Sequence, residues 1–201
     1  MEIATSAGTA RAVIDEVADP ALLLVLTHGA GGGADSGDLL AARQAGMDAG
    51  AVVARVLQPY RVRGARAPGS VARQDAAWLE IVAVLRARFP ALPLVQGGRS
   101  NGARVACRTA RQAGARAVIA LAFPLHPPGH PERSRAGELA AAGTEVLVVN
   151  GDRDPFGVPT GGGRVTVVVL SGEAHALTRQ PERIRRAVAV WLTGLLTAAA
   201  G

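Results

Sequence analysis

The sequence contains no lysine, one cysteine and few aromatic residues. Its single cysteine, Cys107, excludes an internal disulfide. Aromatic residues make up only 3% of the chain. A hydrophobic core must therefore be built from alanine, valine and leucine, which favours helices that lie close to a sheet. All 22 basic residues are arginine. Because alanine is also abundant, we interpret the arginines as a compositional bias and not as a functional signal.

Long apolar segments are also absent. No run approaches the roughly 20 residues that a membrane-spanning helix needs. The first residues lack the basic start and the apolar stretch of a signal peptide. With a single cysteine the chain is also compatible with a reducing compartment. We therefore expect a cytoplasmic protein without a membrane partner.

The formal net charge is +6, which calls for a test of nucleic-acid binding. The arginines are scattered and alternate with acidic residues, and no basic run is interleaved with aromatic residues. We therefore expect no nucleic-acid partner. The histidines and acidic residues also lack the spacing of metal ligands, so the sequence predicts no metal site and no cofactor.

Short apolar runs alternate with segments of helical spacing. The runs end at turn residues and predict strands buried on both faces, as in a parallel sheet: 21–26, 51–56, 92–96, 117–123, 145–150 and 164–170. Helical segments are predicted at 71–88, 101–113, 132–142 and 181–198, the first with Val71, Trp78, Leu79, Val82 and Leu85 on one face. Residues 2–17 suit a two-stranded lead-in around Gly8. The pattern predicts one α/β domain over residues 1–201, with a mostly parallel central sheet and helices on both faces.

Residues 98–102 read Gly-Arg-Ser-Asn-Gly, a G-x-S-x-G pattern between a predicted strand and a predicted helix. This context is typical of a nucleophile elbow, a sharp turn that presents the serine hydroxyl above the sheet. Ser100 is then the candidate nucleophile. Two alternatives remain: an ordinary turn with Ser100 as a helix N-cap, and a phosphate-binding loop, which lacks the expected Lys-Ser or Lys-Thr ending.

A serine nucleophile needs a base, and in an elbow fold the base follows the last strand. His175 lies directly after the predicted strand 164–170 and before the last helix. It is therefore the candidate base. His126 and His130 lie in the proline-rich stretch 124–131, and we interpret them as loop or rim residues.

The acid that orients the base is expected after the strand at 145–150. Asp154 is favoured because it lies a little past the strand end, where a loop can reach back to an imidazole. Asp152 is the alternative, although it suits pairing with Arg153 or capping of the turn. Glu173 is a further option, close to His175 in sequence.

Acyl transfer also needs hydrogen-bond donors for the oxyanion. The backbone N–H of Asn101, directly after the serine, is one candidate. The other is the N–H of Ala30 in the glycine-rich stretch 27–33, where small residues allow close approach to a substrate. We expect His28 to hold this loop by hydrogen bonds. The alternative interpretation of the glycine run is a flexible loop.

The motifs of the chain resemble those of the α/β-hydrolase superfamily. They are LTHGAGGG (26–33), GGRSNGAR (97–104), LAFPLHPPGHPERSR (121–135), NGDRDPFG (150–157) and GEAHAL (172–177). Within this superfamily the chain resembles the small lidless group that is similar to the dienelactone hydrolases. Within it the likeness is to a branch with testis-expressed hydrolase-like proteins and a hydrolase-like domain of an NSL histone-acetyltransferase-complex subunit. This resemblance implies an α/β-hydrolase fold without a large cap domain, and a triad of Ser100, Asp154 and His175.

The sequence departs from dienelactone hydrolases at the nucleophile, where they carry cysteine and this chain carries serine. Their particular reaction is therefore not implied, and the expected activity is hydrolysis of a small-molecule ester or thioester through an acyl-enzyme. Because hydrolase folds also serve as scaffolds, an inactive binding module is the alternative. Arg99, Arg153 and the stretch 61–66 are candidates for a preference for anionic acyl groups; solvated arginines that reflect composition are the competing explanation.

Overall fold

The computed structural model describes residues 1–200, with side chains for residues 1–198; residue 201, the last of the predicted domain, lies outside the described residues. The strands are β1 (Glu2–Thr5), β2 (Gly8–Asp15), β3 (Leu22–Thr27), β4 (Ala51–Leu57), β5 (Leu94–Arg99), β6 (Ala117–Leu121), β7 (Glu145–Gly151) and β8 (Val165–Leu170). The helices are α1 (Gly37–Asp48), α2 (Pro59–Val62), α3 (Val71–Arg88), α4 (Asn101–Ala113), α5 (Ala136–Ala141) and α6 (Pro181–Ala200).

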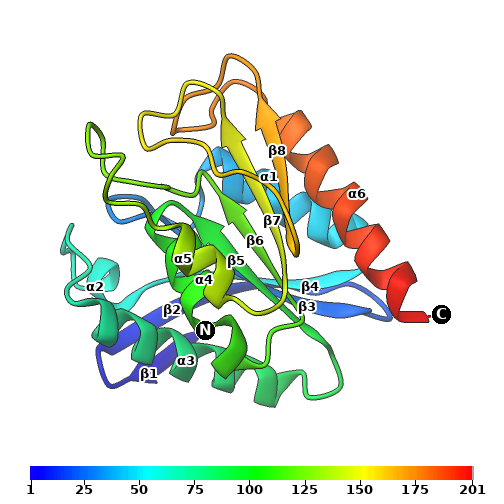
Figure 1. Ribbon diagram of the computed structural model, residues 1–201. Helices are drawn as coiled ribbons and strands as arrows, with labels where there is room; N and C mark the ends of the chain where they lie inside the picture. The colour runs from blue at the N-terminus through cyan, green and yellow to red at the C-terminus, as the bar shows by residue number, and fades with distance from the viewer. Residues whose placement is uncertain (201) are drawn as a thin grey trace.

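The strands form one twisted sheet with the order β1-β2-β4-β3-β5-β6-β7-β8 (Figure 1). β1 and β2 pair antiparallel with each other, and β2 pairs antiparallel with β4. All pairs from β4 to β8 are parallel. The predicted mostly parallel sheet and the two-stranded lead-in around Gly8 are therefore confirmed. Because β3, β5, β7 and β8 run the same way, the loops that follow them meet at one edge of the sheet.

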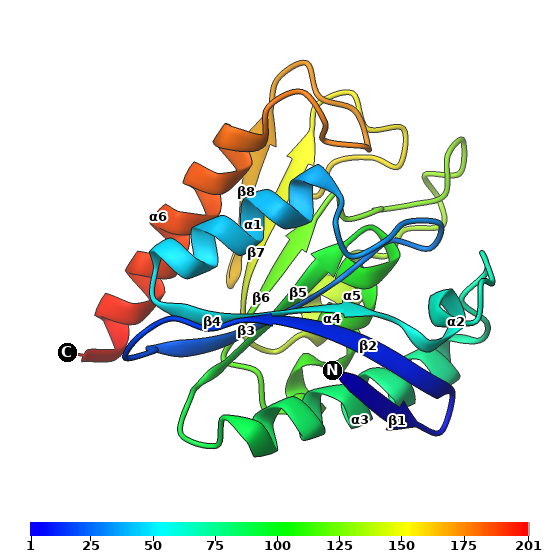
Figure 2. The same ribbon diagram turned by 180° about the vertical axis from the view of Figure 1, so that it is seen from behind.

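Helices cover both faces of the sheet. α1 and α6 lie together on one face, and α3, α4 and α5 lie on the other (Figures 1 and 2). The helices approach closely, as the scarcity of aromatic residues predicts. At Gly46 of α1, an added Cβ would lie 2.7 Å from Leu24 Cδ2 in β3. Small residues on the helices thus fill the layer that larger side chains fill in other proteins.

The structure corrects the predicted burial of the last strand. Residues 164–170 were expected to be buried on both faces, but β8 begins at Val165 and forms the edge of the sheet. Most of its side chains are partly exposed, and Val169 is 45% exposed. The apolar run reflects β propensity at an edge.

Two predicted helices differ in detail. The helix expected over 132–142 begins only at Ala136, because the backbone N–H of Arg135 donates to the Leu125 carbonyl and ties the preceding turn to the loop. In α3, Val71 was predicted on the buried face but is exposed, since it starts the helix beyond the packed region. No helix in the described part of the chain is both long and apolar enough to cross a membrane.

Candidate active site

Ser100 lies in a strained turn between the end of β5 and the start of α4. Its backbone has φ 51° and ψ −114°, a combination that is costly for a residue with a side chain. The Ser100 N–H donates to the Leu121 carbonyl of β6 at 2.9 Å and holds the turn in place. Ser100 occupies the N-cap position of α4, as the alternative interpretation predicts, but its side chain makes no capping hydrogen bond. Its hydroxyl is therefore free for another partner.

The glycines on either side of Ser100 are required by close backbone contacts. An added Cβ at Gly98 would lie 2.5 Å from the Thr27 carbonyl oxygen. At Gly102 the corresponding distance to the His28 carbonyl oxygen is 2.6 Å. Real Cβ atoms do not approach backbone atoms this closely, so the turn fits between β3 and α4 only with glycine at both positions.

The loops after β5, β7 and β8 bring three predicted side chains together. His175 Nδ1 donates to Asp154 Oδ2 at 2.8 Å. With that proton on Nδ1, the other ring nitrogen accepts: Ser100 Oγ donates to His175 Nε2 at 2.9 Å. A hydroxyl, an imidazole and a carboxylate therefore form one hydrogen-bonded chain at the carboxyl edge of the sheet. This arrangement can remove a proton from a serine hydroxyl.

The Asp154 side chain is fully buried. Its second oxygen accepts the backbone N–H of Phe156 at 2.9 Å. The other acidic candidates point elsewhere. Asp152 accepts the backbone N–H of Gly172 at 2.7 Å, and Glu173 accepts that of Arg179 at 2.7 Å. Of the acids considered from the sequence, only Asp154 therefore contacts the imidazole.

Two supporting side chains were missed in the sequence. The Phe156 ring packs against the His175 imidazole with ring centroids 4.3 Å apart. Asn150, fully buried at the end of β7, binds the Phe123 backbone through both halves of its amide, at 2.8 and 3.0 Å. Both residues belong to the stretch 150–157, so the NGDRDPFG pattern was the available signal.

The loop after β3 lies directly against the serine turn. An added Cβ at Gly29 would lie 3.3 Å from Ser100 Cβ. His28, fully buried, donates from Nδ1 to the Gly29 carbonyl at 2.8 Å and accepts the Gln58 N–H at Nε2, at 3.0 Å. Burial lowers the pKa of His28 and keeps the ring neutral. The prediction that His28 holds the loop is confirmed.

The backbone N–H groups of Ala30 and Asn101 have no acceptor among the described residues. Each residue is held in place by other atoms. The Tyr60 hydroxyl donates to the Ala30 carbonyl at 3.0 Å, and the Asn101 side-chain amide donates to Gln74 Oε1 at 2.7 Å. Two fixed amides beside the serine are thus free to donate to a ligand oxygen.

Arg99 is engaged inside the site. Its Nε donates to Asp38 Oδ2 at 2.7 Å, and one terminal nitrogen donates to the His175 carbonyl, also at 2.7 Å. Asp38 is only 1% exposed. The guanidinium is thus held by a buried carboxylate and a backbone carbonyl, and it connects the serine turn, α1 and the histidine loop. A role of Arg99 in anion binding stays a prediction.

The remaining candidates lie where the sequence predicts them. His126 is half-buried in the loop 124–131 and bonds the Pro127 carbonyl, while exposed His130 pairs with Glu132. Cys107 is fully buried in α4, and burial raises the pKa of its thiol, so it is a packed residue. Within the part of the chain that the structure describes, no group of three or more His, Cys, Asp or Glu residues is placed to hold a metal ion.

Solved structures share this fold at low sequence identity. A serine hydrolase homologue from Coxiella burnetii aligns with a TM-score of 0.79 and 16% identity, over 96% of each chain. A lidless serine hydrolase from Xanthomonas campestris aligns at 0.74 and 19%, over 95% of this chain and 93% of that one. Est1E from Butyrivibrio proteoclasticus, in complex with ferulic acid, aligns at 0.72 and 15%, over 98% and 99%. The predicted α/β-hydrolase fold without a large cap is confirmed.

Comparison of the sequence itself gives one family. No curated protein matches the chain. A family model described as "Alpha/beta hydrolase domain" matches residues 20–179, which is most of the 201 residues and includes every residue of the site. The chain therefore belongs to this family of alpha/beta hydrolase domains.

Proposed function

We propose that this protein is a serine hydrolase that cleaves a carboxylic ester or thioester through an acyl-enzyme on Ser100. The observation that carries the proposal is the hydrogen-bonded chain from Ser100 through His175 to Asp154, with contacts of 2.9 and 2.8 Å. Esterases and serine hydrolases among the similar folds support an ester as the substrate class.

In this mechanism Ser100 Oγ attacks the carbonyl carbon while its proton passes to His175 Nε2. The tetrahedral oxyanion accepts hydrogen bonds from the backbone N–H groups of Ala30 and Asn101. When the carbonyl re-forms, the bond to the leaving oxygen or sulfur breaks, and His175 protonates the leaving group. Water then repeats the sequence on the acyl-enzyme and releases the acid. Asp154 keeps Nδ1 protonated and stabilises the imidazolium in both steps.

Other expectations from the sequence belong to the same proposal. We assign residues 1–201 to one α/β-hydrolase domain, in the dienelactone-hydrolase-like branch of testis-expressed and NSL-subunit hydrolase-like proteins. We propose a small-molecule ester as partner, with no nucleic acid or membrane partner, no cofactor and a cytoplasmic location.

A fluorophosphonate probe tests the nucleophile. We expect one phosphonylated serine in the wild type and in Ser6→Ala, an exposed control, and no adduct in Ser100→Ala. Hydrolysis of 4-nitrophenyl butyrate should fall by about 10⁴-fold or more in Ser100→Ala and His175→Ala. Labelling that persists in Ser100→Ala would exclude this serine. Absence of both labelling and turnover in the wild type would favour the binding-module alternative.

A further inference from the structure

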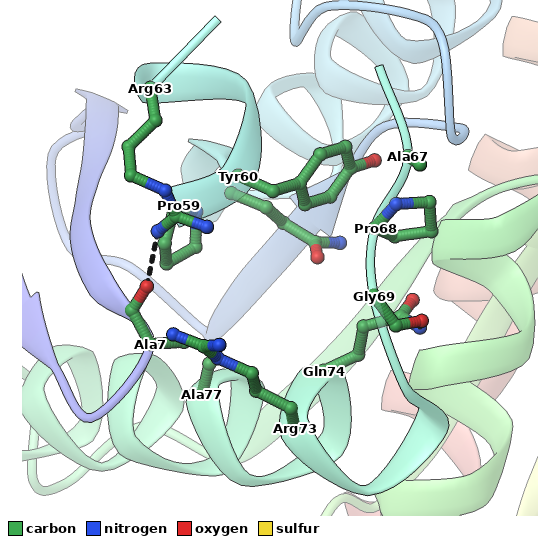
Figure 3. Close-up of a pocket in the computed structure, with 11 residues that line it drawn as sticks. Ala7, Pro59, Tyr60, Arg63, Ala67, Pro68, Gly69, Arg73, Gln74 and Ala77 are labelled. Atoms are coloured by element: carbon green, nitrogen blue, oxygen red, sulfur yellow. Dashed lines mark hydrogen bonds between the residues drawn. The ribbon is translucent and has the colours of Figure 1, made fainter. Parts of the chain in front are cut away.

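A small pocket lies beside the serine turn, on the far side of the residues that hold the two free amides. It has a volume of about 80 Å³ and is lined by α2, the start of α3 and the β1–β2 turn (Figure 3). Pockets that enclose a whole drug-sized ligand measure roughly 300–1,000 Å³. This pocket therefore has room for a small chemical group and not for a whole substrate.

The pocket is next to the reacting centre because its walls hold the proposed oxyanion donors. Tyr60 lines the pocket and donates to the Ala30 carbonyl at 3.0 Å. Gln74 lines it as well and accepts the Asn101 side-chain amide at 2.7 Å. Tyr60 and Gln74 thus contact the pocket on one side and the residues that carry the two backbone amides on the other.

The polar groups at the other end of the pocket are cationic. Arg63, at the end of α2, and Arg73, in the first turn of α3, reach in from opposite sides toward Ala7 (Figure 3). The lining residues of the described chain include no carboxylate, and neither guanidinium is in an ion pair there. Arg63 donates only to the carbonyl oxygen of Ala7. The N-terminal end of α3 adds partial positive charge to the same wall.

Other arginines near the site do have carboxylate partners, whereas Arg63 and Arg73 have none among the described residues. Arg99 pairs with Asp38, and Arg108 pairs with Asp75. Two unpaired guanidinium groups facing one small pocket form the donor set that binds a carboxylate or a phosphate through paired hydrogen bonds.

We propose that Arg63 and Arg73 form an anion subsite for the substrate, so that the preferred esters carry a carboxylate or phosphate at the end of a short acyl chain. This inference rests on the proposed function. It assigns the anionic preference to Arg63, from the stretch 61–66 considered in the sequence, together with Arg73. Arg66 is exposed, as Arg63 and Arg73 are, but it does not line the pocket and has no part in the subsite.

Matched esters test the subsite by activity. The monoethyl esters of succinic, glutaric and adipic acid are compared with the ethyl esters of butyric, valeric and hexanoic acid. We expect the wild type to favour at least one charged ester over its neutral partner by about tenfold in kcat/KM, since hydrogen bonds to charged groups are the stronger ones. Arg63→Gln and Arg73→Gln should each remove most of this preference and leave the neutral esters unchanged. Arg66→Gln should keep it.

A binding measurement separates the subsite from the chemistry. Three proteins are titrated with glutarate and with inorganic phosphate: the single variant Ser100→Ala, and two double variants that combine it with Arg63→Gln or with Arg73→Gln. A Kd for either anion that is about fivefold or more higher in both double variants supports the subsite, even if no ester is hydrolysed and the proposed function fails. Hydrolysis of neutral esters without any charged preference, together with no arginine-dependent anion binding, overturns the subsite and leaves the hydrolase proposal standing.

Discussion

At the scale of single residues, Arg99 decides how the histidine is held. The carbonyl of His175 accepts from Arg99, and Arg99 is fixed by the buried carboxylate of Asp38. The imidazole is thus positioned by Asp154 at Nδ1, by this contact to its backbone and by Phe156 against its ring. Small displacements of a catalytic group are expensive, because proton transfer requires hydrogen-bond distance in the transition state.

We therefore expect Arg99→Lys to lower kcat for 4-nitrophenyl butyrate by about 10- to 100-fold, with little change in KM. Lysine keeps the positive charge beside Asp38 but cannot donate to two separate acceptors in the geometry of a guanidinium. The rate of fluorophosphonate labelling should fall in parallel. Arg153→Lys, at an exposed position nearby, is the control. Equal loss of kcat in both variants, or no loss in Arg99→Lys, would contradict the positioning role.

The sequence was informative about individual residues only where the topology fixes their place. Ser100, Asp154 and His175 each follow a recognisable apolar strand, so their meeting at one sheet edge follows from the parallel order. Arg99 and Asp38 are 61 positions apart. The helix that carries Asp38 has no apolar stripe to reveal which side is buried. Such a contact depends on tertiary packing and not on local pattern.

At the scale of elements, Gln96 joins three pieces of structure within the core. It is fully buried in β5, where its Oε1 accepts the indole N–H of Trp78 in α3 at 3.0 Å. Its Nε2 donates to the Ala106 carbonyl and to Thr109 Oγ1 in α4, at 2.7 and 3.1 Å. The two helices on this face are thus placed relative to β5 by polar contacts as well as by apolar packing.

We expect Gln96→Met to lower the free energy of unfolding by about 1–3 kcal/mol, because the Trp78 indole N–H is left buried without an acceptor. Adding Trp78→Phe removes that donor. The double variant should then lose less stability than the sum of the two single variants, as a urea-denaturation double-mutant cycle measures. Strict additivity would mean that this hydrogen bond does not couple α3 to β5.

Among the elements, α3 and α4 match their predicted limits because local chemistry marks their ends. Ser70 caps the start of α3, and Gly114 ends α4 in the left-handed region with φ 65°. α2 was missed because a single helical turn after Pro59 has no periodicity to detect. α1 buries mostly alanine and glycine, so its limits could not be read from apolar spacing either.

At the scale of the whole molecule, the sequence pattern predicted a mostly parallel sheet, but it did not predict the order of the strands in that sheet. Apolar runs identify buried strands, but the insertion of β4 between β2 and β3 is decided by long-range packing. That insertion brings Asp15 at the end of β2 next to Arg43 of α1 and Arg55 of β4. The antiparallel lead-in is thereby tied to the parallel sheet and to one helix layer by a partly buried ionic contact.

Asp15 accepts two hydrogen bonds from Arg43, at 2.6 and 2.8 Å, and this contact lowers the pKa of its carboxyl. A carboxyl whose pKa is lower in the folded state stabilises the fold fully above its unfolded pKa, about 4, and loses this effect as the pH falls through the folded value. We expect Asp15→Asn to lower the free energy of unfolding by about 1–3 kcal/mol at pH 7.

The difference in the free energy of unfolding between Asp15→Asn and the wild type should persist to pH 5 and then narrow toward pH 3. The wild type loses the contact when Asp15 is protonated, whereas the variant lacks it at every pH. Urea denaturation at pH 7, 5, 4 and 3 measures this. Glu2→Gln, which breaks the exposed pair with Arg11, should cost less than about 1 kcal/mol at pH 7. A difference for Asp15→Asn that stays constant down to pH 3 would show that the loss comes from packing and not from the charge of the carboxylate.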